Sequence, residues 1–234
     1  MDGVEGRQRA LSDLPLLDWG QVRAQAIAAS RGDTRTVIGI AGAPGAGKST
    51  LSSAVVAAVE KAEPGSCVLV GMDGWHLAHE VLTRAGTVSR KGAPETFDGA
   101  GYVDALRRVG GQRSDDLPIW LPEFRRDIEN AVAGSVAVRP EHRLILTEGN
   151  YLLLDTEPWN AVRSLLDICW YVDVPDELRL ARLAARHEHF GRSVDEAAHR
   201  ARVVDQSNAD LVEAAAGRAD AVVSLDELPP PGAI

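Results

Sequence analysis

Residues 42–49 read Gly42-Ala-Pro-Gly-Ala-Gly-Lys-Ser49, which matches the pattern G-x-x-x-x-G-K-[S/T] of a phosphate-binding loop (P-loop). In such a loop, backbone N–H groups surround a polyphosphate, the lysine reaches the β- and γ-phosphates, and the serine hydroxyl binds Mg²⁺. The dinucleotide-binding pattern G-x-G-x-x-G does not fit, because Gly45-Ala-Gly47 is followed by Lys-Ser-Thr. The remaining alternative is a glycine-rich turn with a solvated lysine. The residues expected to hold the nucleotide are Gly42, Ala43, Pro44, Gly45, Ala46, Gly47, Lys48, Ser49 and Thr50.

The sequence around this loop has the strand–loop–helix order that the motif requires. Thr36–Ala41 is a short apolar run rich in β-branched residues, which is typical of a buried parallel strand. Thr50–Glu60 has apolar residues at helical spacing, and Pro64-Gly65 ends that pattern. The helix N-terminus would direct its partial positive charge at the phosphates, with Lys48 facing solvent and the ligand. We therefore predict a nucleoside triphosphate site.

Length, charge and cysteine content narrow the class of protein. The 234 residues suffice for one large α/β domain, alone or with a small appendage. The formal net charge of −9 argues against a general nucleic-acid surface, which needs clustered excess cations. No run approaches the roughly 18 apolar residues of a membrane span, and residues 1–6 lack the features of a signal peptide. Cys67 and Cys169 lie in apolar runs, so we expect buried thiols in a cytoplasmic protein.

Strand-like and helix-like segments alternate after residue 35, which predicts an α/β fold with a five-stranded parallel sheet and helices on both faces. The expected strands are Thr36–Ala41, Ser66–Met72, Arg143–Thr147, Ile168–Val174 and Ala221–Leu225. The expected helices lie near 49–62, 75–85, 99–109, 157–166, 176–190 and 194–216. We divide the chain into an N-terminal helical extension (1–34), one domain (35–228) and a loose tail (229–234). Residues 84–135 are rich in glycine and proline and too long for a simple crossover, so we predict a segment that covers the substrate.

Two acidic residues are expected at the carboxyl ends of strands, where parallel sheets bind their ligands. Glu148 ends the third predicted strand and, given the upstream P-loop, is predicted to hold Mg²⁺ together with Ser49. Asp73 ends the second, and is predicted to accept or align the proton of an attacking hydroxyl. The alternatives are a solvent-facing Glu148 and an Asp73 that caps the next helix. We expect His76 to contact the substrate, whereas Trp75 is equally consistent with the core and with a substrate wall.

A basic helix follows the fourth predicted strand. Arginines recur at i, i+3 and i+7 from Arg179 to Arg186, before a glycine interrupts the helix. Phosphoryl transfer develops negative charge that arginines stabilise. We predict a helical lid near 179–200 in which Arg182, Arg186 and Arg192 reach the nucleotide and exclude water. The alternative is a solvated basic helix face.

Several stretches match one family when they are taken together. They are Gly39–Thr50, Met72-Asp-Gly-Trp-His76, Arg90-Lys-Gly-Ala-Pro-Glu-Thr-Phe-Asp98, Thr147-Glu-Gly-Asn-Tyr-Leu-Leu-Leu154, Arg182–Arg192 and Asp205-Gln-Ser-Asn208. On these residues the chain resembles the phosphoribulokinase/uridine kinase/pantothenate kinase group of P-loop kinases, over residues 36–224. Within that group it looks most like the subgroup labelled fructose-transport kinase or nucleoside/nucleotide kinase-like.

The resemblance implies roles for individual residues. Asp73 would be the acid/base beside the acceptor hydroxyl, and Glu148 the second acidic magnesium partner. The residues expected to contact the substrate are Asp73, Trp75, His76, Arg90, Lys91, Phe124, Arg125, Arg126, Glu148 and Tyr151. The group more often carries Phe where this chain has Trp75, so the bulkier ring is expected to reshape the acceptor pocket.

These observations together predict an enzyme that uses ATP and Mg²⁺ to phosphorylate a hydroxyl of a small polar metabolite. Asp73, Lys48 and Arg186 are the expected catalytic residues. A sugar or a nucleoside is the preferred acceptor, and pantothenate is the alternative. From another class, a regulatory P-loop switch would hydrolyse ATP alone, whereas a GTPase is disfavoured because the string N-K-x-D does not occur. The resemblance leaves a homodimer open.

Overall fold

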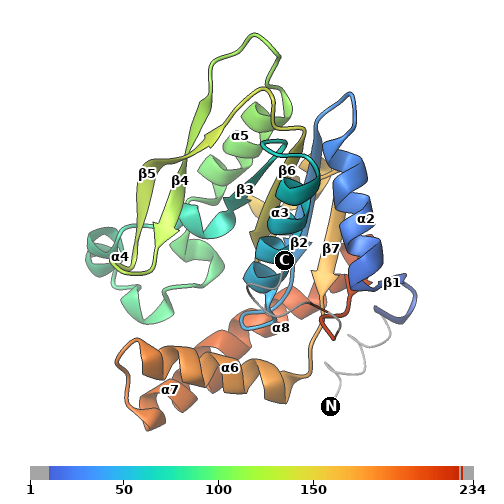
Figure 1. Ribbon diagram of the computed structural model, residues 1–234. Helices are drawn as coiled ribbons and strands as arrows, with labels where there is room; N and C mark the ends of the chain where they lie inside the picture. The colour runs from blue at the N-terminus through green and yellow to red at the C-terminus, as the bar shows by residue number, and fades with distance from the viewer. Residues whose placement is uncertain (1–10, 227, 229–234) are drawn as a thin grey trace.

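The computed structural model of the chain describes residues 11–226 and residue 228. Its centre is a sheet of six parallel strands in the order β1-β8-β7-β2-β6-β3 (Figure 1). The strands are β1 (Leu16–Leu17), β2 (Thr36–Ala41), β3 (Cys67–Gly71), β6 (Leu144–Gly149), β7 (Ile168–Val172) and β8 (Ala221–Val223). All five predicted strands are present. The predicted count was one too low, because the two-residue strand β1 pairs with β8 at the edge of the sheet.

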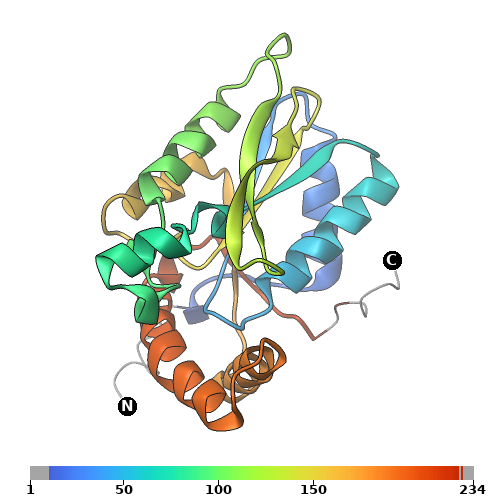
Figure 2. The ribbon, with the colours of Figure 1, turned by 90° about the vertical axis from the view of Figure 1, so that its left-hand side faces the viewer.

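Helices cover both faces of this sheet, as predicted (Figure 2). Alternate side chains of β2 point to opposite faces. Ile38 and Ile40 join the hydrophobic cluster formed with α2 (Trp19–Ser30) and α3 (Lys48–Ala62). On the opposite face, Val37 belongs to the cluster that contains α5 (Gly99–Gly110). Both clusters bury the strands, which explains why the strand sequences read as continuous apolar runs.

Two predicted helices have a different form in the structure. The helix expected near 157–166 is two short 3₁₀ turns, Trp159–Ala161 and Arg163–Leu165. Trp159 and Val162 are both buried, and their i, i+3 spacing suits the three-residue turn of a 3₁₀-helix. The segment expected near 75–85 begins as a 3₁₀ turn (η1, Met72–Trp75) and continues as α4 (His79–Ala85).

The lid region is a helical hairpin followed by a long helical run. Helix α6 (Asp176–His189) ends before Gly191, whose φ of 90° lies in the left-handed region that glycine favours. The run that follows consists of α7 (Val194–Arg200), a π-helical turn (Ala201–Asp205) and α8 (Gln206–Ala214). The helix predicted near 194–216 is therefore present, but it contains a π turn that its sequence pattern did not predict.

Residues 84–135 are ordered: α5 confirms the helix predicted near 99–109, whereas the sequence did not predict the turns before it or the hairpin after it. Two 3₁₀ turns (η2, Val88–Arg90; η3, Pro94–Thr96) and α5 are followed by an antiparallel hairpin of β4 (Ile119–Arg125) and β5 (Asn130–Val138). The hairpin lies tightly on η1, because a Cβ on Gly74 would come within 2.5 Å of the Pro122 carbonyl oxygen. This close packing brings the hairpin over the carboxyl end of β3.

The described residues contain no helix with both the length and the apolar character needed to cross a membrane. Residues 1–10 of the predicted N-terminal extension and the tail predicted at 229–234 lie outside the described part of the chain. Within the extension, β1 completes the edge of the sheet and α2 covers one of its faces.

Candidate active site

The P-loop wraps the N-terminus of α3 in the conformation that its glycines permit. Gly45 and Gly47 have φ values of 79° and 100°, in the left-handed region where a Cβ is strained. Gly45 also lies against α6, because an added Cβ would come within 2.9 Å of the Arg179 carbonyl oxygen. Helix α3 begins at Lys48 with no side-chain cap, so its first N–H groups are free to bind an anion.

Lys48 is buried within this loop, which contradicts the expectation of a solvent-facing lysine. Its Nζ donates to the carbonyl oxygens of Gly42 and Ala43 at 2.9 and 3.1 Å, and to Asn150 Oδ1 at 2.7 Å. Burial lowers the pKa of Lys48 to about 8, although Glu148 and Asp73 act in the opposite direction. The loop and the residue after β6 therefore hold one ammonium group at the centre of the site.

Ser49 and Glu148 meet at the start of α3. The Ser49 hydroxyl donates to Glu148 Oε1 at 2.7 Å. Burial raises the pKa of Glu148, while Lys48 lowers it and Asp73 raises it further. A hydroxyl and a carboxylate are the hard oxygen ligands that Mg²⁺ prefers, and this ion usually completes its shell with waters and substrate phosphates. The donor set thus fits magnesium, although the described residues contain no cluster of three or more His, Cys, Asp or Glu residues that could hold a metal.

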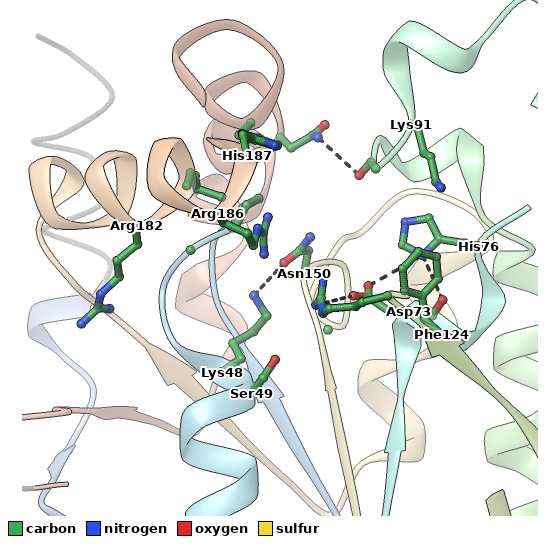
Figure 3. A pocket seen from close by; sticks show the side chains of 18 of the residues that line it. Lys48, Ser49, Asp73, His76, Lys91, Phe124, Asn150, Arg182, Arg186 and His187 are labelled. Carbon is green, nitrogen blue, oxygen red and sulfur yellow. Dashed lines mark hydrogen bonds and ion pairs between the residues drawn. The ribbon is translucent and has the colours of Figure 1, made fainter. Parts of the chain in front are cut away.

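Asp73 lies next to this pair because of the sheet register. Gly71 at the end of β3 is the register partner of Glu148, so η1 carries Asp73 to the same edge of the sheet (Figure 3). The Asp73 side chain is 40% exposed, and Arg126 Nη2 lies 3.7 Å from its Oδ2. Helix α4 begins at His79, with Ala78 as its N-cap and no side-chain cap. The alternative of Asp73 as a helix cap is therefore wrong.

Aromatic rings line the pocket beyond Asp73. The ring of His76 lies 4.0 Å from that of Phe97 and 4.7 Å from that of Phe124, measured between centroids. Lys91 Nζ lies 5.3 Å from the centroid of the Phe124 ring. Burial lowers the pKa of His76, and its Nδ1 is 2.9 Å from the backbone oxygen of Asp73. His76 is thus a neutral, fixed part of the wall.

Helix α6 closes the opposite side of the pocket. Arg182, Arg186 and Arg192 all line the cavity, as does Phe190 near the end of the helix. Arg182 Nη1 donates to the carbonyl oxygen of Ala46 in the P-loop at 3.4 Å. Figure 3 shows Arg186 projecting from α6 toward the space above Lys48 and Asn150. All three predicted lid arginines therefore line the same cavity as the P-loop, and Arg182 contacts the loop directly.

Two predicted substrate residues belong to the protein interior. Trp75 is 7% exposed and packs edge-on against Tyr102, with 5.0 Å between ring centroids, so its bulk does not shape the pocket directly. Tyr151 is fully buried, and its hydroxyl donates to the carbonyl oxygen of Gly92. Both side chains support the walls of the pocket and neither lines it.

Two predicted basic substrate residues lie on the outer surface. Arg90 pairs with Glu95 at 2.6 Å, and Arg125 pairs with Asp127 at 3.0 Å. Neither arginine lines the cavity. In β4 alternate side chains point to opposite faces, so Phe124 and Arg125 cannot both face the pocket.

Several pocket residues were not among those predicted. They are Gly92, Phe97, Glu129, Gly149, Asn150, Leu183, His187, Phe190, Arg200, Asp205 and Asn208. All of these except Glu129 and Arg200 fall within the stretches on which the family resemblance rests, so their position in the sequence was a usable signal. Arg200 had no such signal, because it reaches the pocket only through the fold of the lid.

Comparisons with known proteins agree with this geometry. The family model described as phosphoribulokinase/uridine kinase matches residues 37–227. A Schizosaccharomyces pombe protein named as a candidate uridine kinase is 33% identical over 186 residues, which cover 76% of this chain and 78% of the relative. An Aspergillus versicolor protein named as ATP-dependent kinase-like is 38% identical over 146 residues, or 59% of this chain and 85% of the relative.

A solved structure extends the comparison to the fold. The crystal structure of a candidate fructose transport system kinase from Silicibacter sp. TM1040 has a TM-score of 0.76 at 36% identity, covering 87% of this chain and 98% of the other. The matched family segment includes the P-loop, Asp73, Glu148 and the whole lid. The chain therefore belongs to the phosphoribulokinase/uridine kinase family, and it is an ATP-dependent kinase that phosphorylates a hydroxyl group.

Proposed function

We propose that this kinase transfers the γ-phosphoryl group of ATP to a hydroxyl of a small, neutral, polyhydroxylated metabolite, a sugar or a nucleoside. One observation carries the proposal: Lys48, Ser49 and Glu148 lie on one side of a single cavity that also contains Asp73 and an aromatic wall. Nucleotide and acceptor can thus meet in line, and catalysis of this kind rests mainly on positioning and electrostatics.

Each side chain has a role that suits its surroundings. Lys48 and the loop N–H groups bind the phosphates, and Asp73 accepts or aligns the proton of the attacking hydroxyl. Ser49 and Glu148 would hold Mg²⁺, which neutralises phosphate charge when it is bound. Arg182 and Arg186 stabilise the negative charge on the transferred group.

The charges beside Asp73 favour a neutral acceptor over pantothenate or a sugar phosphate. Arg126 has Asp73 as its partner at 3.7 Å, and Lys91 has the Glu129 carboxylate at 3.5 Å. Arg200 donates to backbone carbonyl oxygens, one of them on Lys91 at 2.9 Å. Each of these three cations thus already has a partner within the described chain. An acidic acceptor would need a cation that is available to pair with its negative charge. Aromatic walls instead suit the apolar face of a sugar ring or a base.

The dependence of ATP turnover on an added hydroxyl compound tests this proposal. We expect ADP release to rise strongly with one member of a panel of neutral sugars and nucleosides, and to stay low with pantothenate or sugar phosphates. A thermal-shift screen with a non-hydrolysable ATP analogue would find that member first, because a bound ligand raises stability by mass action. Equal turnover with and without every acceptor would favour a regulatory NTPase switch and reject the kinase proposal.

Arg186→Ala tests the proposed role of the lid. Because its guanidinium would be closest to the charge of the transition state, we expect kcat to fall by on the order of 10²-fold with little change in the KM for ATP. Exposed Arg202 lies outside the pocket and provides the control substitution Arg202→Ala. Hydrogen exchange over residues 179–200 should slow when an ATP analogue and the acceptor are both present. Full activity of Arg186→Ala would return this arginine to a solvated helix face.

A further inference from the structure

Two side chains of the lid form hydrogen bonds with the backbone of Ser89–Gly92, a segment on the side of the cavity where the acceptor is proposed to bind. Arg200 in α7 donates to the carbonyl oxygens of Ser89 and Lys91, at 3.4 and 2.9 Å. Asn208 in α8 donates to the carbonyl oxygen of Gly92 at 3.3 Å. Arg200 is partly buried and Asn208 is buried, and both side chains line the pocket. The lid thus contacts the backbone of Ser89–Gly92 in addition to facing the nucleotide side.

The same segment is tied to the P-loop through a second route. Tyr151 donates to the Gly92 carbonyl oxygen that Asn208 also contacts. The residue before Tyr151 is Asn150, whose Oδ1 accepts from Lys48 Nζ. One carbonyl group, that of Gly92, therefore joins the lid to the strand end that holds the P-loop lysine. Lys91, which precedes Gly92 in the sequence, places its ammonium group over the ring of Phe124 in the pocket wall.

The π-helical turn explains how Arg200 and Asn208 reach one segment. An α-helix turns about 100° per residue, so residues eight apart would point about 80° away from each other. A π turn closes its hydrogen bonds over five residues and accommodates one extra residue, which leaves that pair about 20° apart. The turn Ala201–Asp205 lies between the two side chains. It also brings Asp205 to His187 of α6, at 2.7 Å.

We propose that Arg200 and Asn208 are positioning residues that hold Ser89–Gly92 against the pocket when the lid is in place over the nucleotide. They act through the backbone of this segment and thereby fix Lys91 in the acceptor wall. The inference rests on the proposed function in one respect, since it takes this side of the cavity as the acceptor side. Nucleotide binding would then order the acceptor side before the acceptor arrives.

The test uses the full chain and a non-hydrolysable ATP analogue with Mg²⁺, without any acceptor. In the wild type we expect the analogue to slow hydrogen exchange in the P-loop, in residues 179–200 and in residues 88–98. In Arg200→Gln and Asn208→Leu, the P-loop and lid should still be protected, but residues 88–98 should lose their nucleotide-dependent protection. Arg202→Gln, an exposed change within the π turn, should behave as the wild type.

A kinetic measurement separates positioning from mere structural support. With the acceptor found by screening, Asn208→Leu, which removes one hydrogen bond, should raise the acceptor KM by about tenfold. Arg200→Gln removes two hydrogen bonds and should raise it by at least as much, and neither variant should change the KM for ATP appreciably. Protection of residues 88–98 that persists in both variants would overturn the inference, as would equal rises in both KM values. If the analogue protected no segment of the wild type, the proposed function itself would fail, so the two outcomes are distinguishable.

Discussion

Asp73→Asn is expected to lower kcat by on the order of 10²–10⁴, because asparagine keeps the shape of the side chain but cannot accept a proton. ATP binding should change little, since none of the phosphate-binding groups is altered. The stability of the fold should also be preserved, because the Asp73 carboxylate caps no helix and its side chain is 40% exposed. Steady-state kinetics and a melting curve on the same preparation measure the two effects.

A matched substitution controls for charge on this side of the molecule. Asp127 lies on the same hairpin as Arg126 but outside the pocket, where it pairs with Arg125. Asp127→Asn should therefore leave kcat unchanged. If Asp73→Asn kept its rate, or lost rate only in proportion to lost stability, the carboxylate would not be the group that handles the proton.

The sequence predicted the part of the site that depends on local structure. The P-loop, the strand before it and the helix after it are contiguous, so residue spacing alone predicts their geometry. Glu148 could be assigned to the site because it ends a predicted strand. In the structure, the register of β3 against β6 brings Asp73 beside it. Arg182 and Arg186 could be assigned to one helix face because their spacing is helical.

The remaining parts depend on tertiary contacts that spacing does not encode. Lys48 Nζ donates to Asn150, far along the chain, as well as to the carbonyl oxygens of its own loop, and spacing does not predict this distant partner. Which side of β4 faces the pocket is decided by the packing of Pro122 on Gly74, so Phe124 lines the cavity while Arg125 does not. The π turn shifts the helical phase by one residue, and this shift places Arg200 and Asn208 on the side of the helix that faces Ser89–Gly92.

Lys48→Met is expected to reduce phosphoryl transfer by on the order of 10³-fold, because it removes the one ammonium group held against the phosphates. Methionine fills a similar volume, so the P-loop should keep its backbone shape. Lys61→Met, at the exposed far end of the same helix, is the matched control and should retain full activity. Retained turnover in Lys48→Met with the acceptor present would exclude the P-loop from the mechanism.

The same variant makes a prediction about pH, because Lys48 has a folded-state pKa of about 8. In the unfolded chain a lysine titrates near about 10.4, so between these values the unfolded state binds more protons and the free energy of unfolding rises with pH. The methionine side chain does not titrate, so the Lys48→Met variant lacks this contribution to the pH dependence. The wild type should therefore gain about 2 kcal/mol relative to Lys48→Met between about pH 7 and about pH 10. Denaturant unfolding at both pH values measures this gain, and a stability difference that does not change with pH would show that burial does not lower the pKa of Lys48.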